Sequence, residues 1–103
     1  LEFCSVFGNL MDNAIEAERT ITDGKKIEIL IEEKMGYLRL LVQNKIDRSV
    51  LKENPELRTT KKTEGVHGIG HKSVERTMQK MGGAVKYYEK DGMFCAETVF
   101  PVK

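Results

Sequence analysis

The sequence predicts an α+β fold, a two-layer α/β sandwich in which helices cover one face of a mainly antiparallel sheet. Two regions carry apolar residues at steps of three and four, as amphipathic helices do. Two other regions alternate apolar and polar residues around short turns, as β-hairpins do. The order along the chain is helix, hairpin, long loop, helix, hairpin. Hairpins separated by helices favour an antiparallel sheet with the helices on one face.

The first expected helix ends near Glu18, and the first hairpin follows it. The hairpin alternates over residues 25–33, turns at Met35-Gly36 and continues over residues 37–42. The apolar residues of the helix recur at helical spacing: Phe3, Val6, Phe7, Leu10, Met11, Ala14 and Ala17.

The second half begins with a region that lacks periodicity. Residues 45–62 carry six Lys and Arg against three Asp and Glu, which predicts a long basic loop with a short helical turn around Leu51. A second helix over residues 71–81 stops at Gly82-Gly83, where glycine favours a helix end. The second hairpin, residues 84–88 and 93–100, flanks the preferred Asp-Gly turn at Lys90-Asp91-Gly92.

Length and composition limit the chain to one small domain with one core. It has 103 residues, with 17 Lys and Arg against 16 Asp and Glu, a formal net charge of +1. A chain with nearly balanced charges lacks the strongly basic surface of a general nucleic-acid binder, so we expect no nucleic-acid partner.

Cys4 and Cys95 are far apart in the sequence and do not have the spacing of metal ligands, so we expect both to be reduced thiols that serve as packing residues. The expected core residues are Leu10, Ala14, Ile27, Ile29, Ile31, Leu38, Leu40, Val42, Val74, Met78, Val85, Tyr87 and Val99.

A broad polar face on the first helix can hold a polar ligand. Asn9 and Asn13 lie four residues apart, and Asp12 and Glu16 follow each by three, so all four lie off the apolar stripe. Amide and carboxylate oxygens suit Mg²⁺, which keeps several waters and is commonly shared with phosphates. On spacing alone such a face is more often simply solvated, so both interpretations remain open.

A glycine cluster precedes the second helix. Residues 64–70 contain three glycines and open directly onto the helix, so free backbone N–H groups can point at an anion such as a triphosphate. A P-loop would need Lys directly after the second glycine, but Gly70 is followed by His71. The glycines can equally form only a tight turn. Neither His67 nor His71 has a catalytic partner in sequence.

Three ordered motifs together resemble one family. Residues 7–17 resemble the N box of the ATP-binding catalytic domain of sensor histidine kinases, and Gly68-Ile69-Gly70 with the following helix resembles its G2 box. The histidine kinase catalytic domain is a member of the GHKL superfamily, which also includes gyrase, the ninety-kilodalton heat-shock chaperones and mismatch-repair ATPases. With Thr59-Thr60-Lys61 and His67 included, the motifs resemble the quorum-sensing and peptide-sensing subgroup. The resemblance implies a Bergerat-type fold, with residues 1–103 as a single ATP-binding domain and an ATP lid at about 45–69.

The resemblance also implies that ATP and Mg²⁺ are the cofactors. Asn13 would coordinate the Mg²⁺ that bridges the phosphates, and Asn9 would support the phosphates or the metal's water shell. In the ATP-hydrolysing relatives the residue four before the Mg²⁺ asparagine is a glutamate that activates water, and the amide of Asn9 cannot act as a general base. Phosphoryl transfer to a protein histidine therefore fits better than hydrolysis, with the acceptor imidazole as the nucleophile.

Five further residues acquire roles in the region before the second helix. Gly68, Ile69 and Gly70 would let the lid and the helix start approach the triphosphate. Thr60 and Lys61 of the lid would contact ATP, with Lys61 screening phosphate charge. For these two residues a solvated basic loop is the alternative.

The end of the second hairpin strand departs from the family pattern. The usual G1 box, Asp-x-Gly-x-Gly, is absent, and residues 42–47 read Val-Gln-Asn-Lys-Ile-Asp. Asn44 is the expected replacement, and its amide oxygen would accept a hydrogen bond from the adenine amino group. A neutral acceptor makes a weaker bond than the usual carboxylate. His71 stands where the family commonly has Leu.

The resemblance implies the Mg-ATP-binding catalytic domain of a two-component sensor histidine kinase. It would donate the γ-phosphate to a histidine on a separate dimerisation domain, so no catalytic residue is expected in this chain. The implied partners are that domain and a response regulator, in a homodimeric, membrane-anchored bacterial sensor with this domain in the cytoplasm. The family has a strand before the N box, so we expect an N-terminal truncation, weak ATP binding and no autophosphorylation by the chain alone. The alternatives are a degenerate or truncated interaction module that binds no nucleotide, and an anti-sigma-like serine kinase.

Overall fold

The computed structural model describes residues 2–53 and 70–102. Its helices and hairpins follow the predicted order of helix, hairpin, helix and hairpin, and the helical turn expected around Leu51 is present. Residues 54–62 of the expected basic loop lie outside the described residues. The elements are α1 (Glu2–Glu18), β1 (Ile27–Lys34), β2 (Tyr37–Lys45), α2 (Val50–Glu53), α3 (Gly70–Lys80), β3 (Ala84–Lys90) and β4 (Met93–Pro101).

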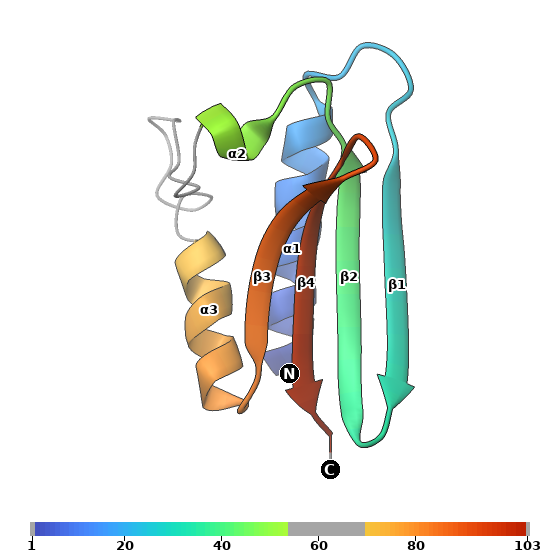
Figure 1. Cartoon of the computed structure of the whole chain (residues 1–103). Coiled ribbons are helices and arrows are strands. Elements are labelled where there is room, and N and C mark those ends of the chain that lie inside the picture. The colour runs from blue at the N-terminus through green and yellow to red at the C-terminus, as the bar shows by residue number, and fades with distance from the viewer. Residues whose placement is uncertain (1, 54–69, 103) are drawn as a thin grey trace.

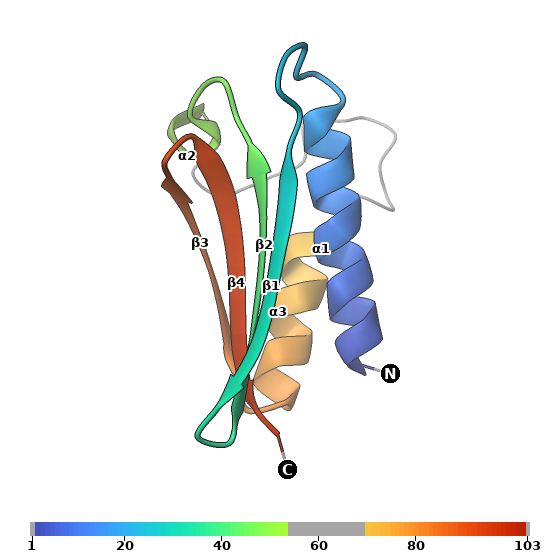
Figure 2. The same cartoon turned by 90° about the vertical axis from the view of Figure 1, so that its right-hand side faces the viewer.

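In the described residues the strands form one four-stranded sheet with α1 and α3 on the same face (Figure 1). The strand order is β1-β2-β4-β3, and each neighbouring pair is antiparallel. Figure 2 shows the sheet nearly edge-on, with both helices on one side of it. The predicted two-layer α+β fold is therefore confirmed. Within the described ranges, no helix combines the length and the apolar character needed to span a membrane.

One main hydrophobic core lies between the sheet and the two helices. α1 contributes a stripe of residues four apart, because that spacing returns to nearly the same side of a helix. α3 contributes Val74 and Met78 by the same rule, and β2 contributes Leu40 and Val42 from alternate positions. The buried members of this core are Val6, Leu10, Ala14, Leu40, Val42, Val74, Met78, Ala96 and Phe100.

Both hairpins turn at two residues with positive φ. Met35 and Gly36 have φ of 54° and 85°, and Asp91 and Gly92 have φ of 54° and 73°. Two consecutive residues of this kind match the right-handed twist of the strands and give tight hairpins. The Asp-Gly turn that the sequence predicts is thus confirmed, and so is the turn at Met35-Gly36.

Two of the expected core residues are exposed. Ile29 and Ile31 are 45% and 50% exposed, although their register partners Val42 and Leu40 are buried. The two isoleucines lie on the same side of the sheet as these partners, but β1 is an edge strand. In Figure 1 α1 lies behind β4 and β2, to one side of β1, so the helix layer does not cover it.

Two further packing predictions fail in part. Val99 is only half-buried, because its register partner is Arg39 on the face of the sheet away from the main core. Cys4 is exposed, because it lies off the buried stripe of α1, whereas Cys95 is buried as expected. Both cysteines are free thiols.

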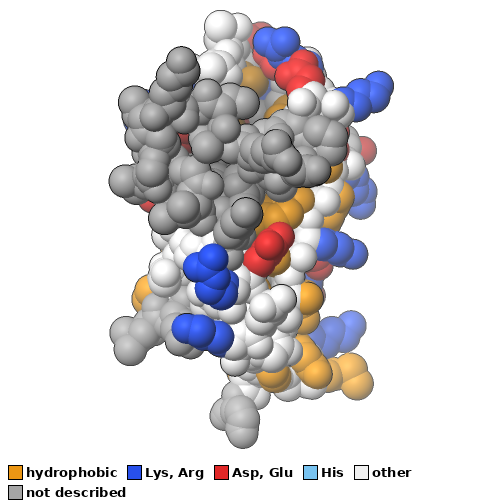
Figure 3. All heavy atoms as spheres, turned by 90° about the vertical axis from the view of Figure 1, so that its left-hand side faces the viewer, with side chains coloured by type: hydrophobic (Ala, Val, Ile, Leu, Met, Phe, Trp, Pro, Cys, Tyr) orange, Lys and Arg blue, Asp and Glu red, His pale blue; other side chains and the backbone are white. Residues whose placement is uncertain are grey.

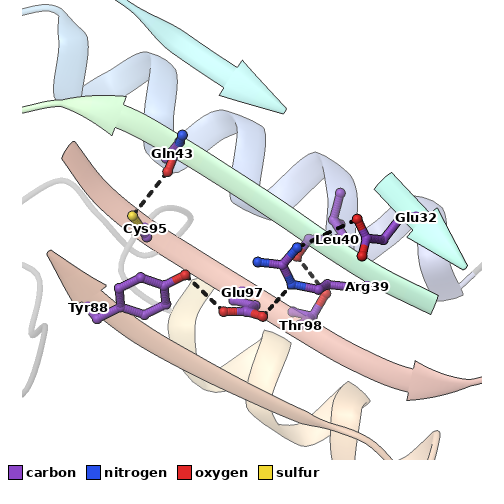
Figure 4. A network of polar contacts seen from close by, with 8 residues as sticks. All are labelled: Glu32, Arg39, Leu40, Gln43, Tyr88, Cys95, Glu97 and Thr98. Atoms are coloured by element: carbon purple, nitrogen blue, oxygen red, sulfur yellow. Dashed lines mark hydrogen bonds and ion pairs between the residues drawn. The ribbon is translucent and has the colours of Figure 1, made fainter. Parts of the chain in front are cut away.

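The sheet face opposite the helices is covered by its own long side chains. Leu41, Met93 and Cys95 form a second apolar cluster there, packed against Tyr88. Glu97 accepts hydrogen bonds from Arg39 and, at 2.9 Å, from the Tyr88 hydroxyl (Figure 4). Burial raises the pKa of Glu97, but these two hydrogen bonds and the positive charges of Arg39 and Lys86 together outweigh burial, so the pKa lies below its ordinary value. The polar groups of this network are therefore already engaged with one another.

Candidate functional site

Asn9 and Asn13 lie one turn apart on α1, beside the stripe that faces the sheet. Both are half-buried, whereas Asp12 is exposed. Glu16, the fourth member of the predicted polar face, forms an ion pair with Arg19 at 3.8 Å. Among the residues that the structure describes, none hydrogen-bonds to the side chain of Asn9 or Asn13. Two neighbouring amides therefore keep oxygen atoms for a ligand such as hydrated Mg²⁺.

Asn44 lies near the end of β2, on the side of the sheet that α1 covers. Alternation with Leu40 and Val42 places it there, and its side chain is 4% exposed. Its Nδ2 donates one hydrogen bond to Glu18 Oε2 at 3.2 Å and another to the backbone oxygen of Lys45 at 3.3 Å. In both of these hydrogen bonds the amide nitrogen of Asn44 is the donor.

Glu18 joins Asn44 to the last turn of α1. Its carboxylate is buried, and Oε1 accepts a hydrogen bond from the backbone N–H of Lys26 at 2.9 Å. The Lys25 ammonium donates to the backbone oxygen of Glu18, also at 2.9 Å. A buried carboxylate needs such donors, because burial without them would be very unfavourable.

Sequence reasoning missed the role of Glu18, although a signal was present. Val6, Leu10, Ala14 and Glu18 follow one another at four-residue steps, and each is at most 5% exposed. The stripe that predicts the buried side of the helix thus includes a carboxylate in its last turn. An acidic residue in such a position calls for a polar partner on the opposing strand.

The candidate site extends along α1 from this buried pair. From the rise per residue of an α-helix, Asn13 lies about 7.5 Å and Asn9 about 13.5 Å before Glu18 along the helix axis. Because Asn44 contacts Glu18, it marks one end of the site, and the two free amides mark the other. The polar groups along this side of α1 are therefore spread over more than one helical turn.

An aromatic pair adjoins Asn44 on the same side of the sheet. Phe94 of β4 is the register partner of Asn44, and its ring stacks on that of Tyr87 with centroids 6.0 Å apart. Burial raises the pKa of Tyr87 to about 12, and the charge of Glu75 acts in the same direction. The phenol therefore stays neutral at physiological pH, and half-buried Phe94 offers apolar surface beside the Asn44 amide.

Glu89 of β3 holds the segment that follows β2. Its carboxylate accepts hydrogen bonds from Ser49 Oγ (2.7 Å) and from the backbone N–H groups of Val50 (2.7 Å) and Leu51 (2.9 Å). The N–H of Leu51 is the largest influence on the pKa of Glu89, which lies below its ordinary value although burial opposes the shift. Ile46 adds a backbone hydrogen bond to Gly92 at 3.0 Å. The chain beyond Asn44 is thereby fastened to the β3–β4 hairpin.

The remaining predicted residues belong to the region around the start of α3. Gly70 is the first residue of α3, as expected for a glycine segment that opens onto a helix. Thr60, Lys61, Gly68 and Ile69 lie outside the described residues, as does most of the expected lid. Figure 3 shows the side on which α3 lies, and its described surface carries basic and acidic side chains together. Of the predicted site residues that the structure describes, Asn44 is thus the one whose hydrogen bond connects β2 with α1, through Glu18.

The sequence comparison identifies the family. Residues 1–101 match the family model described as the GHKL domain, so the chain belongs to that family. A search of curated protein sequences found no match.

Solved structures of histidine kinases share the fold. The nucleotide-free catalytic domain of histidine kinase ThkA gives a TM-score of 0.75 at 21% identity, over 97% of this chain and 65% of that one. Histidine kinase AdeS of Acinetobacter baumannii gives 0.70 at 16%, over 99% and 46%. The histidine kinase domain of the blue-light activated kinase EL346 of Erythrobacter litoralis gives 0.73 at 15%, over 98% and 43%. At these identities the likeness concerns the fold, and the chain spans less than two thirds of each protein.

Proposed function

We propose that this GHKL domain binds Mg-ATP as the catalytic domain of a sensor histidine kinase and donates the γ-phosphate to a histidine on a separate dimerisation domain. Membership of the GHKL family and the fold shared with histidine kinase catalytic domains support the proposal. The observation that carries it is the arrangement along α1, where the half-buried amides of Asn9 and Asn13 lie at one end and Asn44 lies at the other.

The donor set on α1 fits a magnesium ion shared with phosphates. Within the described ranges no cluster of three or more His, Cys, Asp or Glu side chains could hold a metal. Amide oxygens supply only part of a coordination shell, and Mg²⁺ usually completes it with water and phosphate oxygens. Asn13 would be the protein ligand and Asn9 would contact the water shell or the phosphates. The bound ion would neutralise phosphate charge during transfer.

The base and the phosphates would contact different parts of the chain. Asn44 Oδ1 would accept a hydrogen bond from the adenine amino group, next to the ring of Phe94. The phosphates would approach Gly68, Ile69 and Gly70 at the start of α3, and Thr60 and Lys61 would cover them from a lid at about residues 45–69. Because an amide at position 9 cannot activate water, transfer to a histidine is favoured over hydrolysis.

The parent protein would place this reaction in a signalling chain. The motifs of the N box and of residues 59–70 support the quorum-sensing and peptide-sensing subgroup. In that setting the dimerisation domain of a homodimeric, membrane-anchored bacterial sensor supplies the phosphoacceptor. A response regulator then receives the phosphoryl group.

Calorimetric titration with ATP in the presence of Mg²⁺ tests the proposal. Asn13→Ala should weaken ATP binding by about tenfold or more, because it removes a metal ligand. Gln79→Ala removes an exposed amide from α3 and should leave the affinity unchanged. A folded wild-type chain that binds no ATP would sink the proposal and favour an interaction module. Mixed with the dimerisation domain of its parent, the chain should yield phosphohistidine; phosphoserine on another protein would instead indicate a serine kinase.

A further inference from the structure

We propose that Glu18 is a positioning residue that fixes the amide orientation of Asn44 and so makes the site select a 6-amino purine. The inference rests on the proposed function, because it takes Asn44 as the contact to the base. It adds a determinant of base specificity on α1, a helix whose predicted role concerns the phosphates.

The surroundings of Asn44 permit only one orientation of its amide. Nδ2 donates both to Glu18 Oε2 at 3.2 Å and to the backbone oxygen of Lys45 at 3.3 Å. Turning the amide by 180° would bring Oδ1 against two oxygen acceptors with no proton between them. Both Asn44 and Glu18 are at least 95% buried, so water cannot readily relieve that repulsion.

Glu18 is itself held in place. The backbone N–H of Lys26 donates to its second carboxylate oxygen at 2.9 Å, and the Lys25 side chain donates to its backbone oxygen at 2.9 Å. The carboxylate therefore bridges β2 and the residue just before β1. Because a backbone amide anchors one oxygen, the other remains aimed at Asn44.

In this fixed orientation Oδ1, and not Nδ2, is the atom of the Asn44 amide whose hydrogen-bonding capacity the described part of the chain leaves unused. Among the described residues none donates a hydrogen bond to it. An acceptor in this position suits the 6-amino group of adenine and opposes the 6-oxo group of guanine or hypoxanthine, whereas an unconstrained amide could turn to suit either. Donation to a carboxylate also polarises the amide and strengthens Oδ1 as an acceptor. That effect offsets the weaker acceptor that Asn provides where the family commonly has Asp.

The orientation can be measured first in the nucleotide-free protein. In wild type the Asn44 side-chain amide protons should exchange slowly with water and show cross-relaxation with the Glu18 side chain in NMR spectra. Glu18→Gln should shift these signals and speed their exchange by about tenfold. Glu33→Gln, at the exposed end of β1, should change neither. Fast exchange of the Asn44 amide protons in wild type would overturn the proposal, and so would Asn44 signals that do not change in Glu18→Gln. Both outcomes hold whether or not nucleotide binds.

Base selectivity is the second measurement. Wild type should bind ATP more tightly than inosine triphosphate, and Glu18→Gln should reduce that preference by roughly three- to tenfold, the worth of one hydrogen bond. A preference that is unchanged in folded Glu18→Gln protein would refute the inference. Failure of wild type to bind either nucleotide would refute the proposed function, and the NMR measurement would still decide the orientation. The wild-type NMR result also decides it if Glu18→Gln does not fold.

Discussion

At the residue scale, Asn44 places a neutral amide beside the buried carboxylate of Glu18. A second ionised carboxylate in that position would be strongly unfavourable. The amide donates to Glu18 Oε2 at 3.2 Å, and both residues belong to the interior. A carboxylate at position 44 would have to face Glu18 at nearly the same distance. Like charges this close in a poorly solvated place destabilise the folded state strongly. The neutral amide of Asn44 therefore avoids a repulsion that an ionised carboxylate would meet here.

This reasoning predicts coupling between the two positions. Asn44→Asp alone should lower the free energy of unfolding by about 2–4 kcal/mol at pH 7, because it leaves a buried charge without a donor. Adding Glu18→Gln should recover most of that loss, since the new amide can donate to the new carboxylate. Urea unfolding of the four proteins in a double-mutant cycle measures the coupling. A double variant no more stable than Asn44→Asp would show that the two side chains do not act as a pair.

At the element scale, β1 shows that an apolar strand need not be a buried strand. Its isoleucines at positions 29 and 31 point to the same side of the sheet as Val42 and Leu40, yet about half of each remains exposed. The difference arises from lateral position, because the two helices pack over the other strands. The apolar alternation predicts which residues share a face, but it does not predict whether a helix covers that face.

Ile31 and Leu40 form a matched pair for testing this difference, because they are direct register partners. Leu40 is 0% exposed, so Leu40→Ala should cost about 2–5 kcal/mol of unfolding free energy. Ile31→Ala should cost less than about 1 kcal/mol, because much of its side chain already contacts water. Urea denaturation at one pH compares them. Equal losses would mean that β1 is covered in solution.

At the scale of the whole molecule, the hydrogen-bonded carboxylates of Glu18 and Glu89 connect parts of the chain that are distant in sequence. Glu18 connects the end of α1 with β2, and Glu89 connects α2 with the other edge strand, β3. Both carboxylates accept backbone N–H groups as well as side-chain donors. Glu18 thereby holds Asn44 itself, and Glu89 holds the segment that follows it in the sequence.

The hydrogen bonds to Glu89 predict a specific pH dependence. Hydrogen bonding lowers the pKa of Glu89 below its ordinary 4.5, so the ionised carboxylate stabilises the fold above about that pH. This contribution is lost as the pH falls through the lower folded-state pKa. Glu89→Gln should therefore cost about 1 kcal/mol at pH 7, a value typical of a helix cap, and much less near pH 3. Urea unfolding at both pH values measures the difference.

Glu53→Gln serves as the control, because among the described residues the Glu53 carboxylate pairs only with exposed Arg48, at 3.5 Å. An exposed ion pair contributes little, so this variant should differ from wild type by less than about 0.5 kcal/mol at either pH. If Glu89→Gln costs the same at pH 7 and pH 3, the ionised carboxylate is not what holds α2.

The local structure and the candidate residues on α1 could be predicted from short stretches of sequence. Helical and strand periodicities depend on neighbouring residues, so α1, both hairpins and the Asp-Gly turn could be predicted before any contact was known. The four-residue spacing of Asn9 and Asn13 likewise required only a helix. The exposure of Ile29 and Ile31, and the contact of Glu18 with Asn44, 26 residues further along the chain, became known only from the packing of the elements. Those outcomes depend on strand order and on which strands the helices cover, and neither is encoded in a local period.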